Sequence, residues 1–170
     1  MNQILLSYAI EPTTRAFLEE FNRAPLPYTL SVEEACKAFS DLHAVDVVKL
    51  PADVNDLQIP DGPKGQVLIR IIRPKGTTEA LPVIMFFHGG GWVFGDKDVF
   101  DPLVREIANG SNAAVVFVDY TLSPEAKYPT AIEEAYAATK YVAEHGKIFN
   151  LDSSRLAVRE TALGETWQSL

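Results

Sequence analysis

Three consecutive glycines after a histidine are the residues of this sequence best suited to chemistry. They follow an apolar, partly β-branched run at residues 82–87, which is typical of a strand buried on both faces. His88 comes next, followed by Gly89, Gly90 and Gly91. Glycine tolerates positive φ angles and close approach of the backbone. We therefore expect a sharp turn that can aim bare N–H groups at a ligand.

Two chemistries use a glycine turn directly after a buried strand. A dinucleotide site needs the spacing G-x-G-x-x-G, and Asp119 could then bind the ribose. That spacing fails, because Phe94 replaces the third glycine and Trp92 fills the approach to the pyrophosphate. The other chemistry is acyl transfer, in which backbone N–H groups stabilise an oxyanion. The HGGG form favours acyl transfer, with Gly90 and Gly91 as the two donors.

The residues after the loop predict the elements that hold it. Apolar residues at helical spacing indicate a helix over residues 99–108, which Asn109 and Gly110 should end. Residues 113–118 are typical of a second buried strand. A strand, a helix and a strand in this order predict parallel pairing with a right-handed crossover.

Longer stretches of the sequence resemble a known family. HGGGWVFGDKD at residues 88–98, VVFVDYTLSPEAKYPTAIEEAYAATKYV at 115–142 and LDSSRLAV at 151–158 are similar to the hormone-sensitive-lipase branch of the α/β-hydrolases. Members of that family are carboxylesterases and lipases. The similarity covers residues 25–158, with Thr121 standing where many members carry arginine. It implies an α/β fold, the N-terminal half of an α/β-hydrolase, with a mostly parallel sheet, flanking helices and an N-terminal helical cap segment.

The resemblance also assigns roles around the glycine loop. It implies that four residues support the loop structurally, namely His88, Gly89, Tyr120 and Glu125. Trp92 and Phe94 are expected to line the substrate pocket, and core packing accounts for them almost equally well. The substrate would be a small-molecule ester. We expect no metal and no organic cofactor, because the sequence has neither a Cys/His cluster at ligand spacing nor a phosphate loop.

Residues 1–44 are expected to form a helical segment separate from the rest. Thr13 and Thr14 are placed to cap a first helix, and Ser31 with Glu34 forms a capping box that opens a second. The resemblance implies a cap over the active site. An amphipathic helix pair that covers a sheet edge fits these residues equally well.

Residues 45–158 are expected to form the partial hydrolase core. Residues 45–50 and 66–73 are strand-like, and the turn-rich segment between them predicts an antiparallel hairpin. Residues 131–145 show helical spacing that His145 and Gly146 should end, and residues 155–158 begin another buried strand.

Composition limits the partners and the compartment. A hydrophobic fraction of 47% excludes a disordered chain, and a net charge of −8 argues against nucleic acid or an anionic membrane surface. Cys36 is the sole cysteine, so no intrachain disulfide forms, and we expect it to be a small core residue. The first residues lack a basic region, and no apolar run approaches the length of a membrane span. These features predict a cytoplasmic location.

Residues 159–170 depart from the family pattern. The strand begun at Leu156 should end in a G-x-S-x-G elbow that carries the nucleophilic serine, and this sequence contains no such motif. One choice of codons for residues 159–170, with a single base restored after Val158, translates as AGDSVGGNMAVV, the family's elbow. The only codon of Trp167 supplies two bases of the methionine codon in that frame. We hypothesise an aberrant tail produced by a one-base frameshift, with the nucleophile lost near Ala162.

The sequence thus predicts a carboxylic-ester hydrolase by family, of the serine type. The catalytic serine, aspartate and histidine are missing from the chain, which we expect to be inactive as it stands. A non-catalytic α/β-hydrolase-like protein that binds a small molecule is the alternative. An unpaired strand edge would in addition favour self-association of the chain.

Overall fold

The computed structural model describes residues 10–23, 25–44 and 47–161. Its contacts divide the chain into two compact units between Ala38 and Phe39. That division falls inside a helix, earlier than the boundary at residue 44 that the sequence predicts.

Two capped helices precede the sheet in the sequence. The helix α1 spans Pro12–Phe21, and after a short 3₁₀ turn at Pro27–Thr29 the helix α2 spans Val32–His43. The capping box is confirmed, because the Ser31 N–H donates to Glu34 Oε2 (2.9 Å) and the Glu34 N–H donates to Ser31 Oγ (3.3 Å). Within α2, Ala35 is buried and Cys36 is only half-buried, so the placement of Cys36 in the core is wrong.

The cap of α1 differs from the predicted one. The carboxylate of Glu11 accepts hydrogen bonds from the N–H groups of Thr13 (3.0 Å) and Thr14 (2.9 Å). These two bonds lower the pKa of Glu11 to about 2. Glu11 is therefore the capping residue, and Thr13 and Thr14 supply the N–H groups that it satisfies.

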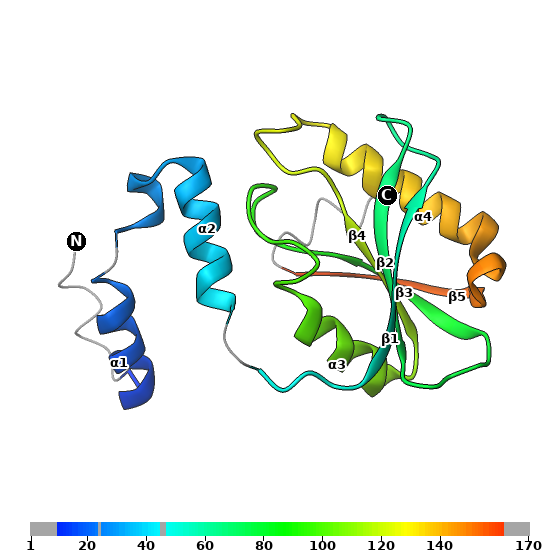
Figure 1. Cartoon of the computed structure of the whole chain (residues 1–170), viewed down its shortest axis with the longest axis horizontal. Helices are drawn as coiled ribbons and strands as arrows, with labels where there is room; N and C mark the ends of the chain where they lie inside the picture. Colours follow the sequence, from blue (N-terminus) through cyan, green and yellow to red (C-terminus); the bar gives the residue numbers. More distant parts are fainter. Residues whose placement is uncertain (1–9, 24, 45–46, 162–170) are drawn as a thin grey trace. The chain divides into compact units, whose positions relative to one another are not determined.

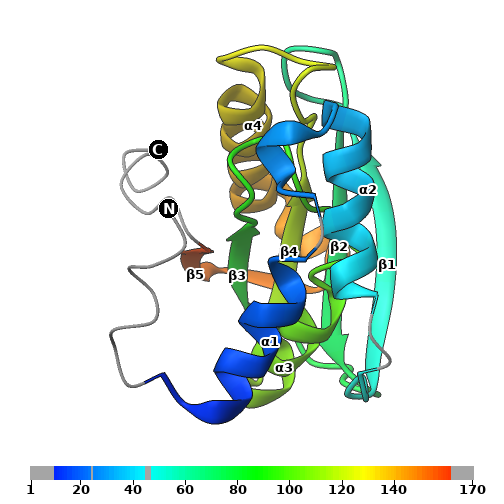
Figure 2. The same cartoon turned by 90° about the vertical axis from the view of Figure 1, so that its left-hand side faces the viewer.

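The described part of the second unit contains one five-stranded sheet. Its strands are β1 (Ala52–Ile59), β2 (Val67–Pro74), β3 (Leu81–Phe87), β4 (Ala114–Asp119) and β5 (Leu151–Glu160). Their order is β1-β2-β4-β3-β5, which can be followed across Figure 2. β3 pairs in parallel with β4 and with β5, whereas β2 pairs antiparallel with β1 and with β4. The predicted parallel pair around the glycine loop and the predicted hairpin are both confirmed.

The position of the first hairpin strand was predicted wrongly. The eight residues of β2 pair from Pro74 back to Val67 with Ala52 forward to Ile59. Residues 47–50 have no regular structure, and Val48 is 90% exposed. A segment with alternating apolar and polar residues forms a strand only if it pairs with a neighbouring strand. The edge of β2 that residues 45–50 would need is already paired with residues 52–59.

One helix end differs from prediction and another agrees with it. The helix α3 spans Asp101–Ser111, runs through Asn109 and Gly110, and ends at Asn112, whose φ is +50°. The helix α4 spans Thr130–His145 with Gly146 as its C-cap, as predicted, and a 3₁₀ turn follows because Gly146 keeps a right-handed φ of −54°. In both places an asparagine, Asn112 or Asn150, takes the left-handed conformation that ends the helical segment.

The two long helices cover opposite faces of the sheet, α4 on one and α3 on the other (Figure 1). One core cluster joins Ala135, Ala138 and Val142 of α4 to Ile69, Ile71, Met85 and Val116. The other joins Val104 and Ala108 of α3 to Ile72, Phe86, Val115 and Phe117. Neighbouring residues such as Ile71 and Ile72 therefore face different helices, as the strand period of two requires.

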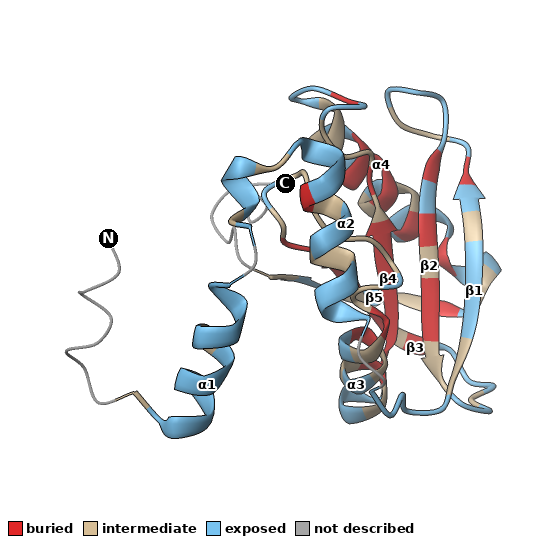
Figure 3. Cartoon of the chain, turned by 60° about the vertical axis from the view of Figure 1, so that its left-hand side comes forward, coloured by how far each residue is buried: buried red, intermediate tan, exposed pale blue. Residues whose placement is uncertain are grey.

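The inner strands are buried and the outer strands are not. Figure 3 shows β2 and β4 buried over most of their length, while β1 is largely exposed. On β5, Leu151 is the sole buried residue, and Val158 is 48% exposed. No helix of the described residues is long and apolar enough to cross a membrane.

Candidate active site

The glycine loop after β3 is a tight turn of unusual backbone angles. Gly90 has a φ of +118°, Gly91 of +62° and Trp92 of +59°. The carbonyl of Gly90 accepts hydrogen bonds from the N–H groups of Val93 (3.1 Å) and Phe94 (2.9 Å). A Cβ atom on Gly90 would lie 2.1 Å from the carbonyl oxygen of Phe94. Residue 90 must therefore be glycine, whereas a Cβ on Gly91 would meet no atom within 4 Å.

The N–H groups of this loop are used unequally. The Gly89 N–H donates to Thr161 Oγ1 at 2.7 Å. None of the hydrogen bonds recorded among residues 10–23, 25–44 and 47–161 has the N–H of Gly90 or Gly91 as its donor. Gly91 is exposed and Gly90 half-buried. Two adjacent N–H groups thus remain available to a ligand at the positions selected from the sequence.

His88 lies under the loop in an aromatic stack. The residue is only 2% exposed. Its ring stacks parallel to the rings of Tyr120 (centroids 4.3 Å apart) and Phe117 (5.2 Å). His88 Nδ1 lies 2.8 Å from the carbonyl oxygen of Gly89, which can only accept, so Nδ1 carries the proton. Burial lowers the pKa of His88, against the opposing effects of that hydrogen bond and of nearby aspartates. His88 is therefore a neutral residue built into the turn.

Tyr120 braces the loop from β4. Its hydroxyl donates to the backbone carbonyl of His88 at 2.6 Å. Burial, together with the negative charge of Asp119, raises the pKa of Tyr120, so the hydroxyl keeps its proton. Glu125 is exposed, and no hydrogen bond of its side chain to another described residue is recorded. The arrangement agrees with support by Tyr120, whereas Glu125 stands away from the loop's contacts.

A buried carboxylate missed by the sequence reasoning does hold this region. Glu134 of α4 is 2% exposed and accepts from the Thr121 N–H (2.6 Å) and from Thr121 Oγ1 (2.9 Å). These bonds fix the chain just after Tyr120. The signal was present in the sequence, because Glu134 lies between Ala131 and Ala138 on the apolar side of a helix.

A pocket of about 210 Å³ opens beside Gly91. Most of its wall is apolar, formed by Gly91, Trp92, Tyr128, Pro129, Ala131 and Ile132. Phe94 is absent from this wall and instead stacks on Phe39 with the ring centroids 5.5 Å apart. Of the two aromatic residues expected in a pocket, only Trp92 lines this one. The tight turn in which the Val93 and Phe94 N–H groups bind the Gly90 carbonyl makes the side chains of Trp92 and Phe94 point in different directions.

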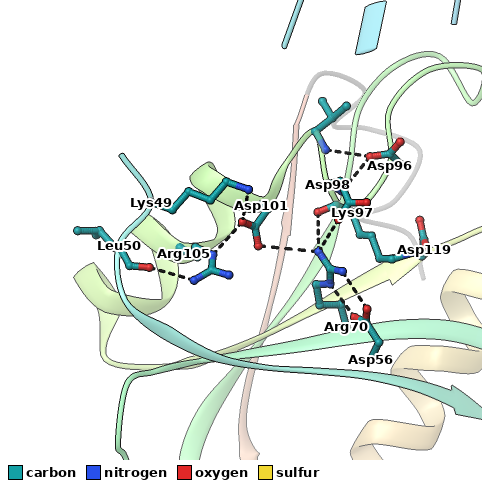
Figure 4. Close-up of polar contacts among 11 residues, drawn as sticks. Lys49, Leu50, Asp56, Arg70, Asp96, Lys97, Asp98, Asp101, Arg105 and Asp119 are labelled. Carbon is teal, nitrogen blue, oxygen red and sulfur yellow. Dashed lines mark hydrogen bonds and ion pairs between the residues drawn. The ribbon is translucent and has the colours of Figure 1, made fainter. Parts of the chain in front are cut away.

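Charged residues anchor the far side of the loop (Figure 4). The carboxylate of Asp96 accepts from the N–H groups of Asp98 and Val99, both at 2.8 Å. Lys97 Nζ binds Asp119 Oδ2 at 3.0 Å, which ties the loop to the end of β4. The Asp119 carboxylate is thus paired with a lysine of this chain and not left to bind a ribose, which argues further against a dinucleotide site.

The described residues do not assemble a nucleophile with a base. The hydroxyl of Ser123 donates to the carbonyl of Ala126 at 2.9 Å. No hydrogen bond recorded within the described ranges joins a serine to a histidine, and His43 and His145 are exposed on helix ends. The predicted position of the lost nucleophile, Ala162, lies outside the described residues. Within the same ranges, no group of side chains is arranged to hold a metal ion.

Comparison with known proteins identifies the family. A family model described as the α/β hydrolase fold matches residues 84–159. The thermostable esterase of Pseudomonas putida ECU1011 superposes on 93% of this chain with a TM-score of 0.86 and 41% identity. The chain belongs to the α/β-hydrolase fold family. This agrees with the mixed sheet, the order of its strands and the glycine loop after β3.

Two further relatives show the extent of the match. Esterase LipI of Mycobacterium tuberculosis is 42% identical over 147 residues, which are 83% of this chain and 45% of LipI. An ester-hydrolase from the Lake Arreo metagenome, in complex with a bipyridine phosphonate derivative, is 29% identical with a TM-score of 0.81, covering 91% of this chain and 51% of that one. The Pseudomonas esterase is covered to 50%. The chain therefore spans about half the length of the relatives it matches.

Proposed function

We propose that this chain supplies the oxyanion-binding loop and part of the substrate pocket of a carboxylic-ester hydrolase with a serine nucleophile. The observation that carries the proposal is the pair of unclaimed N–H groups on Gly90 and Gly91, beside an apolar pocket. When a nucleophile attacks an ester carbonyl, negative charge develops on the carbonyl oxygen. Preorganised backbone donors stabilise that charge, and each is typically worth about 10²–10³ in rate.

The sheet puts the end of β5 beside this loop. β5 runs parallel to β3, and Phe87 pairs with Glu160 at the carboxyl ends of both strands. The next residue, Thr161, donates its N–H to the Phe87 carbonyl (3.3 Å) and accepts from Gly89 (2.7 Å). A serine on a sharp turn after β5 would stand next to Gly90 and Gly91, as acyl transfer requires.

We propose further that the 170-residue chain has no triad-based turnover of esters by itself. Removal of a whole catalytic triad leaves at most about 10³–10⁴-fold catalysis over water, from the oxyanion donors and binding. The expected result is binding of a transition-state mimic with at most this residual hydrolysis.

A chimera tests the catalytic part of the proposal. Residues 1–158 would be followed by the part of the Pseudomonas putida esterase that lies beyond the match, and hydrolysis of p-nitrophenyl butyrate would be measured. We expect the chimera to hydrolyse the ester orders of magnitude faster than the 170-residue chain, which keeps at most the residual rate. A folded chimera that binds esters without turnover would refute the proposal and favour a non-catalytic binding protein.

A phosphonate tests the oxyanion site in the chain as it stands. The Lake Arreo relative is complexed with a phosphonate, and a tetrahedral phosphonate anion resembles the intermediate of ester hydrolysis. With ¹⁵N-labelled glycine, the ten glycine amides can be observed while phenyl methylphosphonate is added. We expect the Gly90 and Gly91 signals to move and the Gly65 and Gly76 signals, on distant turns, to stay in place.

A further inference from the structure

Arg70 joins an edge strand to the glycine loop. It lies on β2 with its side chain 12% exposed. Its Nε and Nη2 atoms donate to the two carboxylate oxygens of Asp56 on β1, at 2.6 and 2.8 Å. This bidentate contact fixes both the position and the plane of the guanidinium.

The other nitrogen of the guanidinium is aimed at the loop (Figure 4). Nη1 donates to the backbone carbonyl of Lys97 at 3.2 Å and to Asp98 Oδ1 at 2.9 Å. It also lies 3.8 Å from Asp101 Oδ1 at the start of α3. Asp101 is in turn held by Lys49 (2.9 Å) and Arg105 (2.8 Å). The segment between the glycines and α3 is thus tied to β1 and β2 through one side chain.

Packing would transmit the position of this segment to the oxyanion donors. Gly95 directly precedes the anchored residues and lies close to the start of the loop. A Cβ on Gly95 would lie 3.2 Å from His88 Nδ1 and 3.4 Å from the Gly89 carbonyl oxygen. Gly95 follows Phe94, whose N–H donates to the Gly90 carbonyl (2.9 Å), and the peptide plane of that carbonyl also carries the Gly91 N–H. A shift of residues 96–98 is therefore passed through Gly95 and Phe94 to the turn that carries Gly90 and Gly91.

Only arginine meets this geometry. The contact with Asp56 needs two parallel N–H donors, and the contacts with Lys97 and Asp98 need a third nitrogen rigidly held to the first two. A lysine ammonium is a point donor and cannot span both sides. Hydrogen bonds to Asp56 and Asp98 raise the pKa of Arg70, so the guanidinium keeps its charge.

We infer that Arg70 is a positioning residue of the oxyanion-binding loop, acting through Lys97 and Asp98 on the N–H groups of Gly90 and Gly91. The use of the loop for ester chemistry rests on the proposed function. The mechanical link from Arg70 to the two glycines does not. Arg70 touches no reacting atom in this scheme and acts only by fixing the direction of the donors.

Arg73 provides a matched control on the same strand. Its Nη1 donates to the Asn150 carbonyl (2.9 Å) and its Nη2 to the Glu79 carbonyl (2.6 Å). Both arginines are partly buried and both hold backbone carbonyls. Replacing Arg73 removes comparable contacts that do not involve the glycine loop, so it measures a structural effect alone.

The test compares Arg70→Met, Arg70→Lys and Arg73→Met in the full chain labelled with ¹⁵N-glycine. The readouts are the urea midpoint, the amide signals of Gly90 and Gly91, and the dissociation constant of phenyl methylphosphonate. We expect Arg70→Met to move both signals and to weaken phosphonate binding about tenfold, the worth of one hydrogen bond to a charged group. Arg70→Lys should restore part of the change. Arg73→Met should lower the urea midpoint and leave signals and affinity unchanged.

Unmoved Gly90 and Gly91 signals in folded Arg70→Met would overturn the inference, as would equal movement in Arg73→Met. If Arg70→Met does not fold, Asp98→Ala replaces it, because Asp98 is 76% exposed and its loss removes only the loop-side carboxylate. The same signals must then move, and their constancy would again overturn the link. Failure of the wild-type chain to bind phosphonate would count against the proposed function, while the glycine signals would still decide the role of Arg70.

Discussion

Alanine in place of Gly90 or of Gly91 separates the shape of the loop from its chemistry. Alanine keeps the backbone N–H, so neither substitution removes an oxyanion donor. The structure nevertheless predicts very different effects, because the two Cβ atoms meet different surroundings. At Gly91 the space is empty within 4 Å and the φ of +62° is the left-handed conformation. Alanine there costs about 1–2 kcal/mol of unfolding free energy.

At Gly90 the same methyl group does not fit. Its Cβ would lie 2.1 Å from the Phe94 carbonyl oxygen and 2.8 Å from the Phe94 carbonyl carbon, both backbone atoms. The turn must open, and the two bonds to the Gly90 carbonyl from Val93 and Phe94 are then lost. With about 1 kcal/mol for each bond and the backbone strain at φ +118°, we expect a loss of at least about 3 kcal/mol.

Urea unfolding and phosphonate binding together measure these effects. Gly91→Ala should fold, lose a small part of its stability and still bind phenyl methylphosphonate. Gly90→Ala should lose more stability and all phosphonate binding. Gly110→Ala is the control, because Gly110 lies in the last turn of α3 with open space around it, so alanine there should not lower the stability. Equal stabilities of Gly90→Ala and Gly91→Ala would refute the reasoning.

Four further outcomes are expected. Burial lowers the pKa of His88, so below about pH 6.5 the unfolded chain binds a proton at this histidine that the folded chain does not. The free energy of unfolding should then drop by up to about 1.4 kcal/mol per pH unit. His88→Gln should abolish this slope in urea titrations between pH 5 and 7. Glu134→Gln leaves one donor of Thr121 unpaired and should destabilise the chain by about 1–3 kcal/mol, against less than about 0.5 for the exposed Glu133→Gln; equal urea midpoints would contradict this. If the edge of β5 drives self-association, Val158→Lys should lower the sedimentation coefficient of concentrated samples, and a wild-type monomer would rule it out. The frameshift hypothesis predicts that one added base after the codon of Val158 opens the G-x-S-x-G frame in the coding DNA, and codons that cannot be shifted into that motif would end it.

Local patterns predicted much of the fold around the site. The buried runs of β3 and β4 and the helical spacing of α3 and α4 were recognisable, since each depends on neighbours within a few residues. The first hairpin strand was misplaced, because its register depends on which residues β2 selects as partners. The helix stop at Asn109 and Gly110 was misplaced too, since packing of Ala108 and the left-handed Asn112 carry the helix further.

The sequence alone determined the chemical nature of the loop. Only glycine fits at position 90, because φ is positive there and any Cβ would lie 2.1 Å from a backbone carbonyl oxygen. This requirement appears in the sequence as the HGGG motif. The tertiary structure alone decided which N–H groups stay available, that Trp92 and not Phe94 reaches the pocket, and that Arg70 contacts the segment after the glycines. Arg70 meets Asp56 and Asp98 across 14 and 28 residues of sequence. Such pairings arise because sheet formation brings distant strands side by side, and no local pattern in the sequence encodes them.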